Sequence, residues 1–237
     1  MQEGSAQTSQ ETTQLLRSVA EQLKIPLATI ARQAELGQLT GDASLTDLSA
    51  IRTHASAALT LVDCYLLGLQ LIREQASLPL EPVSVSSLLV ETAHELQCFA
   101  KQYRTTLQLH IGGKYEPVMA HQAGLKSALL ALGYALLESY PLQQDGYMTL
   151  AVHRTPGGIV AGLYGDFEEL SSDAWRKALE LQGRAPRPFG SINGNGAGLF
   201  VAETILQAMD TKLRVGRYRR QRGLATTLQP SQQLSFV

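Results

Sequence analysis

The spacing of apolar residues between positions 45 and 69 constrains the fold of this chain more than any other feature. The positions recur at alternating steps of three and four, and seven of the eight are apolar: Leu45, Leu48, Arg52, Ala55, Leu59, Val62, Leu66 and Leu69. This pattern is typical of a helix that packs lengthwise against other helices. One helix cannot bury such a seam alone, so the pattern predicts a helical partner.

A second helical pattern precedes this seam and provides that partner. Between about residues 11 and 36, apolar side chains again follow steps of three and four: Leu16, Val19, Leu23, Leu27, Ile30 and Ala34. The polar segment Thr40–Ser44 interrupts the pattern, and Ser44 with Asp47 three residues later marks the start of the next helix. The two helices therefore form a hairpin, residues 1–76. Its apolar stripe exceeds what one chain can cover, so we expect a homodimer built on a four-helix bundle.

The remainder of the chain, residues 77–237, has an α+β pattern. Two prolines in Ser77–Val85 predict a domain boundary. The expected helices lie at about 86–103, 122–138, 172–181 and 199–209, and the expected strands at about 105–111, 116–120, 147–154 and 158–165, with two more after residue 210. A long segment rich in proline and glycine, 182–198, separates the last two helices. This order predicts one sheet covered on one face by helices.

Composition and charge exclude several classes of partner. The chain is 44% hydrophobic and has a formal net charge of −1, so we expect neither a nucleic acid nor a membrane surface as partner. The basic segment Arg214–Arg222 is interpreted as a solvated hairpin. Cys64 and Cys98 lie in apolar helical patterns, which favours a reducing compartment over a disulfide framework or metal site. No uninterrupted apolar run is long enough for a membrane span and no signal core occurs at the N-terminus, so we expect a cytoplasmic protein.

Four motifs, taken in order, resemble a known family. They are "SVAEQLKIPLATI" at 18–30, "LKSALLALGYALLES" at 125–139, "GLYGDFEEL" at 162–170 and "GNGAGLFVAETI" at 194–205. Their order and spacing resemble the sensor histidine kinases, which join a dimerisation and histidine-phosphotransfer hairpin to an ATP-binding domain of the GHKL type. The resemblance covers about residues 11–230. It implies a degenerate phosphotransfer hairpin over 1–76 and a degenerate α/β sandwich of the GHKL type over 77–237.

The first motif lacks the groups that phosphotransfer requires. The resemblance places Glu21 at the position of the phosphate-accepting histidine, five residues before Pro26, and Gln22 at the position of its acidic neighbour. In the family a neutral imidazole attacks the γ-phosphate, and the neighbouring carboxylate orients its other proton. A glutamate forms no phosphoramidate and an amide is no base, so the motif predicts no phosphorylation here. With the turn near residue 42, His54 would lie about 10 Å along the hairpin from Glu21. We interpret His54 as a partly exposed polar residue beside the seam.

The second motif lacks the metal ligand of the family. In the histidine kinases one asparagine of this helix coordinates the magnesium ion that bridges the triphosphate. The asparagine positions fall here on Ala131 and Ala135, whose side chains carry no oxygen for a hard cation. The resemblance therefore predicts no magnesium site.

The third and fourth motifs retain part of a nucleotide site. Asp166 follows a predicted strand at the position of the family's adenine-reading aspartate. The two glycines that normally follow it are replaced by Glu168 and Leu170. The glycines of the fourth motif remain in place to wrap a phosphate at the start of a helix. They are Gly194, Gly196 and Gly198.

These residues favour an inactive homologue that acts by binding proteins. The resemblance implies a homodimer whose partner is the receiver domain of a response regulator or another histidine kinase, with no cofactor. One alternative is an ATP-binding kinase with non-standard ligands that acts on a separate protein. ATP and magnesium belong to that alternative alone, where Asp166 and the run 194–198 would hold the nucleotide. A phosphate relay through the hairpin would need a histidine at position 21.

Overall fold

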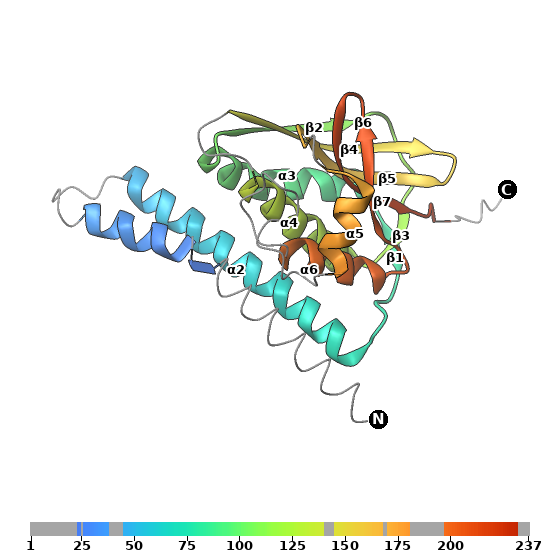
Figure 1. The fold of residues 1–237 in the computed structure, drawn as a ribbon, viewed down its shortest axis with the longest axis horizontal. Helices are drawn as coiled ribbons and strands as arrows, with labels where there is room; N and C mark the ends of the chain where they lie inside the picture. Colours follow the sequence, from blue (N-terminus) through green and yellow to red (C-terminus); the bar gives the residue numbers. More distant parts are fainter. Residues whose placement is uncertain are drawn as a thin grey trace.

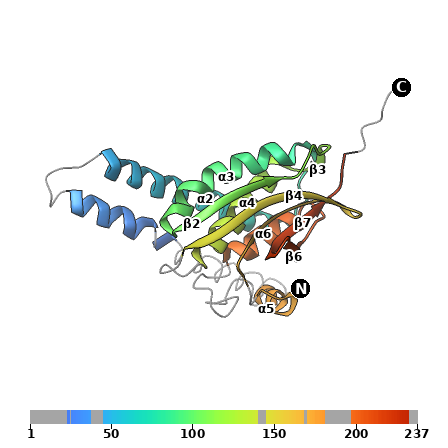
Figure 2. The same ribbon diagram turned by 90° about the horizontal axis from the view of Figure 1, so that it is seen from above.

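The computed structural model describes residues 23–24, 26–37, 45–139, 145–167, 170–180 and 197–231 of the 237-residue chain. Two helices come first: residues 26–37 are helical, and α2 spans Leu45–Glu74. Figures 1 and 2 show these two helices running side by side as a hairpin. The described part of the predicted first helix is thus confirmed, whereas residues 11–22 lie outside the described residues.

The second part of the chain forms a five-stranded sheet. Its strands are β2 (Thr105–Ile111), β4 (Gly146–Thr155), β5 (Gly158–Gly165), β6 (Leu213–Tyr218) and β7 (Gln221–Leu228). The spatial order is β2-β4-β5-β7-β6, in which β2 and β4 run parallel and the other neighbours antiparallel. A separate antiparallel pair joins β1 (Glu81–Val83) to β3 (Val118–Ala120).

Three helices cover one face of this sheet. They are α3 (Val85–Gln102), α4 (Gln122–Glu138) and α6 (Ala197–Gln207), whereas α5 (Ser172–Glu180) lies against β6. Side chains fix two helix starts: the Ser84 hydroxyl accepts a hydrogen bond from the amide of Ser87, and Nδ1 of His121 accepts one from the amide of Gly124. In Figure 1 the sheet, the layer of α3, α4 and α6, and then α2 follow one another.

Helix α4 occupies the middle of this stack, and its sequence reflects that position. Every residue from Ala128 to Glu138 is buried. A helix that is apolar on all sides is suited to such a site, because it has neighbours on every side. The α+β pattern and a main sheet with helices on one face are therefore confirmed. The prediction of a single sheet is wrong, because β1 and β3 pair in a second, two-stranded sheet. Pairing of the hairpin with a second copy stays a prediction.

The hairpin and the second unit share one hydrophobic core. On α2, the side chains of Leu61, Cys64 and Tyr65 are each 1% exposed. The Cys64 thiol donates a hydrogen bond to the carbonyl of Ser127 on α4 at 3.4 Å. Burial raises the pKa of that thiol to about 12, so Cys64 is a protonated packing residue.

Helix α2 also contains the one segment of the described chain, Leu48–Glu74, that is long and apolar enough to cross a membrane by length and composition. Of its most apolar window, 39% is buried inside the protein. The same length and composition occur in helices that line protein cores, and α2 packs against α4 and α6.

Candidate functional site

The hairpin retains the structural frame of the first motif. Pro26 is buried within the helical segment 26–37, and Leu23, in the helical segment 23–24, is partly buried against the core. Glu21 and Gln22, the positions of the phosphoacceptor and its neighbour, lie outside the described residues.

His54 differs from its sequence interpretation. It was expected to be partly exposed, but it is 5% exposed in α2. Desolvation by burial lowers its pKa, and in the described part of the chain its Nδ1 has no hydrogen-bond partner. The apolar spacing of 45–69 identifies the seam, but it does not show which flanking positions are covered by other helices. The burial of His54 therefore could not be predicted from this spacing.

The two alanines of α4 lie where α4 and α6 meet. Ala131 and Ala135 are one helical turn apart and are 0% and 4% exposed. A Cβ atom placed on Gly198, in the first turn of α6, would lie 2.8 Å from the Ala131 carbonyl oxygen and 3.1 Å from the Ala135 Cβ. The helices therefore touch at these three small residues. A longer side chain at position 135 would meet the α6 backbone.

The position of Gly198 differs slightly from the sequence expectation. The helix was expected to start at about residue 199 but begins at Ala197, so Gly198 is a buried helical residue. Its lack of a Cβ serves close packing on α4. Gly194 and Gly196 lie outside the described residues.

A buried carboxylate fixes the other end of α6, a feature that sequence reasoning missed. Glu203 is 5% exposed and accepts hydrogen bonds from the amide of Leu213 at 2.7 Å and from Nε2 of Gln207 at 2.9 Å. Burial raises the pKa of Glu203, while these two donors oppose that rise. The carboxylate therefore attaches α6 to the first residue of β6.

Asp166 follows β5, as the sequence predicted, and is exposed. It lines an open cavity of about 630 Å³ together with Gly165, Phe167 and four arginines of the β6–β7 hairpin: Arg217, Arg219, Arg220 and Arg222. Leu170 is buried, and its amide donates to the Phe167 carbonyl at 3.1 Å. Glu168 lies outside the described residues.

These positions do not form a magnesium site of the family type. Ala131 and Ala135 offer no side-chain oxygen, and α6 occupies the space beside them. Among the described residues, no group of three or more His, Cys, Asp and Glu side chains is placed to hold a metal ion. Asp166 lines a cavity with arginines, whereas Gly198 packs against α4.

Comparisons with known proteins identify the fold. No protein-family model matches the chain, and no curated protein sequence does. Among solved structures, the histidine kinase AdeS of Acinetobacter baumannii superposes with a TM-score of 0.51 at 14% identity, covering 90% of this chain and 98% of AdeS. Full-length ShkA in complex with AMPPNP gives 0.53 at 17% identity, covering 92% of this chain and 46% of ShkA. The catalytic domain of the histidine kinase ThkA gives 0.50 at 11% identity, covering 64% of this chain and 96% of that domain.

The chain therefore has the fold of the sensor histidine kinases. The expected family resemblance is confirmed at the level of the fold, and the match to AdeS extends over both the hairpin and the sheet domain.

Proposed function

We propose that this protein is a catalytically inactive histidine-kinase homologue that acts by binding other proteins in two-component signal transduction. The contact of Gly198 with Ala131 and Ala135 carries the proposal. In an active kinase the corresponding helix presents an asparagine to magnesium, and here that helix face is packed against α6. Without the metal, the charge of a triphosphate is poorly compensated and its leaving group is not activated.

The hairpin supports a role in protein binding. Leucines along one side of α2 are more than half exposed in the single chain: Leu48, Leu59 and Leu66. Exposed apolar rows of this kind mark interaction surfaces. We propose that they pair two copies of the hairpin, and that the resulting cytoplasmic homodimer binds a receiver domain or another histidine kinase.

A nucleotide titration tests the proposal. Calorimetry with AMPPNP, with and without magnesium, should detect no magnesium-dependent binding tighter than about 1 mM. An active sensor histidine kinase in the same buffer provides the positive control. A micromolar dissociation constant that requires magnesium would contradict the proposal and favour the alternative, an ATP-binding kinase with non-standard ligands.

A second measurement tests the phosphoacceptor position. Incubation with radiolabelled ATP and magnesium should leave no acid-labile, base-stable label, because Glu21 and Gln22 supply neither an imidazole nor a neighbouring acid. Label that persists in the unmodified chain but is lost in His54→Gln would assign phosphorylation to that buried histidine and refute the inactive reading.

A further inference from the structure

The β6–β7 hairpin concentrates positive charge that the rest of the chain does not share. Residues 214–222 contain five of the chain's 20 lysines and arginines: Arg214, Arg217, Arg219, Arg220 and Arg222. No aspartate or glutamate occurs from Thr211 to the last residue, Val237. The formal net charge of the whole chain is only −1, so this excess of positive charge is local.

Several hairpin arginines lack the partners that other surface arginines have. Elsewhere, carboxylate oxygens lie 2.9–3.3 Å from guanidinium nitrogens of Arg73, Arg104, Arg154 and Arg176. Within the part of the chain that the structure describes, Arg217, Arg219 and Arg220 form no ion pair. Arg219 instead lies over the ring of Tyr218, 5.6 Å from the ring centre. The hairpin therefore retains guanidinium groups that an anion can occupy.

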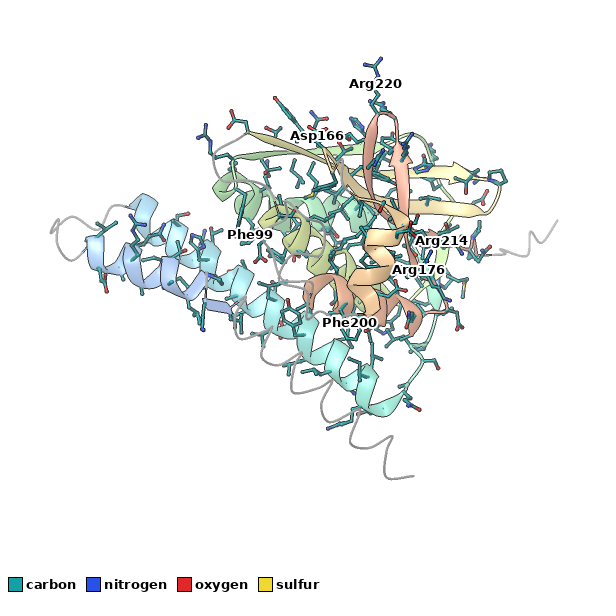
Figure 3. The ribbon with its side chains drawn as sticks, in the orientation of Figure 1. Phe99, Asp166, Arg176, Phe200, Arg214 and Arg220 are labelled. Carbon is teal, nitrogen blue, oxygen red and sulfur yellow. The ribbon has the colours of Figure 1, made fainter. Side chains whose placement is uncertain are left out.

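These arginines line a concave site rather than a flat charged surface. Arg217, Arg219, Arg220 and Arg222 form one wall of the 630 Å³ cavity, and the end of β5 forms the other. Figure 3 shows Arg220 at the tip of the hairpin and Asp166 at the end of the sheet. This volume lies in the range of about 300–1,000 Å³ that small-molecule sites occupy.

Close strand packing holds the two walls of the cavity together. Gly223 of β7 pairs with Tyr164 of β5, and a Cβ atom at position 223 would overlap the Leu163 carbonyl oxygen. Glycine thus allows β7 to approach β5 directly beside the cavity. The hairpin arginines and Asp166 are therefore set by sheet pairing and not by an independent loop.

We propose that this cavity binds a small polyphosphorylated ligand without a metal ion. A guanidinium donates two parallel hydrogen bonds to phosphate oxygens, and the guanidiniums of Arg217, Arg219 and Arg220 together exceed what a single phosphate requires. Four arginines and one aspartate give the lining a formal charge of +3. The Asp166 carboxylate repels phosphate and accepts hydrogen bonds, so we place a hydroxyl group of the same ligand at Asp166.

The charge distribution favours a compact ligand over a polymer. A nucleic acid is bound by a stripe of cations that follows its backbone. Here the cavity lining includes the carboxylate of Asp166, and on neighbouring α5 the guanidinium of Arg176 is paired with Asp173. This site is separate from the α4–α6 contact and does not depend on the proposed protein partner.

Calorimetric titration of the full chain with inorganic tripolyphosphate, at low salt and with EDTA, tests the site. We expect saturable binding that weakens as salt is added. Arg217→Gln and Arg219→Gln should each weaken it about tenfold, as expected for the loss of a charged hydrogen-bonding partner. Arg154→Gln is the matched control, because Arg154 pairs with Glu116 at 3.2 Å, and it should leave the affinity unchanged.

The affinity of the Asp166→Asn variant separates the proposal from misfolding, because misfolding would weaken binding and the proposal expects binding to tighten. Tripolyphosphate carries no hydroxyl or amino donor, so removal of the carboxylate charge should tighten its binding. In the same variant, a polyphosphate that bears free hydroxyl groups, inositol 1,4,5-trisphosphate, should gain less, because its hydroxyl exchanges a charged carboxylate acceptor for a neutral amide oxygen.

A vesicle arm distinguishes the sources of the phosphate groups. Binding to phosphatidylcholine vesicles that contain phosphatidylinositol bisphosphate, together with the free probe, would assign the ligand to a lipid headgroup. Binding to the free probe alone would assign it to solution. The proposal is overturned if tripolyphosphate does not bind at millimolar concentration, or if the hairpin variants and Arg154→Gln lose affinity equally.

Discussion

At the scale of single residues, small side chains determine how closely α4 and α6 pack in the second domain. Ala131, Ala135 and Gly198 let α4 and α6 come close enough that no side chain projects between them. A longer side chain such as asparagine at position 135 and this close helix contact would exclude one another. Alanine at positions 131 and 135 is therefore consistent with selection for close packing.

Gly198→Ala should destabilise the protein, because its new Cβ would lie 2.8 Å from the Ala131 carbonyl oxygen. The expected loss is about 1–3 kcal/mol, typical of overpacked contacts. Urea unfolding followed by circular dichroism measures it. Gly113→Ala is the matched control, since a Cβ there meets nothing within 4 Å. Equal stabilities of the two variants would contradict the packing role of Gly198.

His54 makes stability depend on pH. Burial lowers its pKa below the ordinary value of 6.5, so the unfolded chain takes up a proton more readily than the folded one. Stability should be fully present above pH 6.5 and fall as the pH drops from 6.5 towards the lowered folded pKa. The contribution of His54 is at most about 1.4 kcal/mol per pH unit.

Urea unfolding midpoints between pH 7.5 and 5 measure this slope. His54→Gln should flatten the part that His54 contributes, and the comparison with the unmodified chain removes the contributions of other groups. A variant with the same pH dependence as the unmodified chain would show that His54 is not the titrating group.

At the scale of helices and strands, the sequence predicts features that depend on local residue patterns, but it does not predict features that depend on which elements pack together. Long helices such as α2 and α4 were predicted because the helical periodicity of their apolar residues continues over several turns. The burial of His54 was not, because it depends on which helix packs beside α2. The cavity beside Asp166 was missed for a similar reason. Asp166 and Arg217 are far apart in sequence, and only the pairing of β5 with β7 brings their strands together.

The exposed side of α2 should hold two hairpins together. Leu59 and Leu66 are 66% and 59% exposed in the single chain. Leu59→Glu or Leu66→Glu would place an unpaired charge in an apolar interface and should dissociate the dimer. Sedimentation equilibrium at micromolar concentration measures the mass. Val90→Glu, at a 49% exposed position on α3, is the control and should leave the dimer intact. A monomeric unmodified protein would refute the prediction.

At the scale of the whole molecule, the two units are joined by a core and not merely by a linker. One cluster of buried residues extends from Ala57 on α2 to Leu228 on β7. The amide of Leu78, in the segment between the units, donates to the carbonyl of Ala208 just after α6 at 2.8 Å. In a kinase that phosphorylates its own hairpin, the ATP-binding domain must reach the phosphoacceptor. A shared core between α2, α4 and α6 opposes such movement.

The protein should therefore unfold in one cooperative transition, which tests the shared core directly. Fluorescence of Trp175, the only tryptophan, reports on α5, and circular dichroism at 222 nm reports on all helices. The two signals should give the same urea midpoint at a fixed protein concentration. Gly68→Val should lower both midpoints together, with a loss of about 1–3 kcal/mol in the free energy of unfolding, because even a Cβ added at position 68 would lie 3.0 Å from the Val201 side chain on α6. Gly113→Val is the matched control. If Gly68→Val shifted only one of the two signals, the hairpin and the sheet domain would be separate folding units, and the docked arrangement would no longer argue against domain movement.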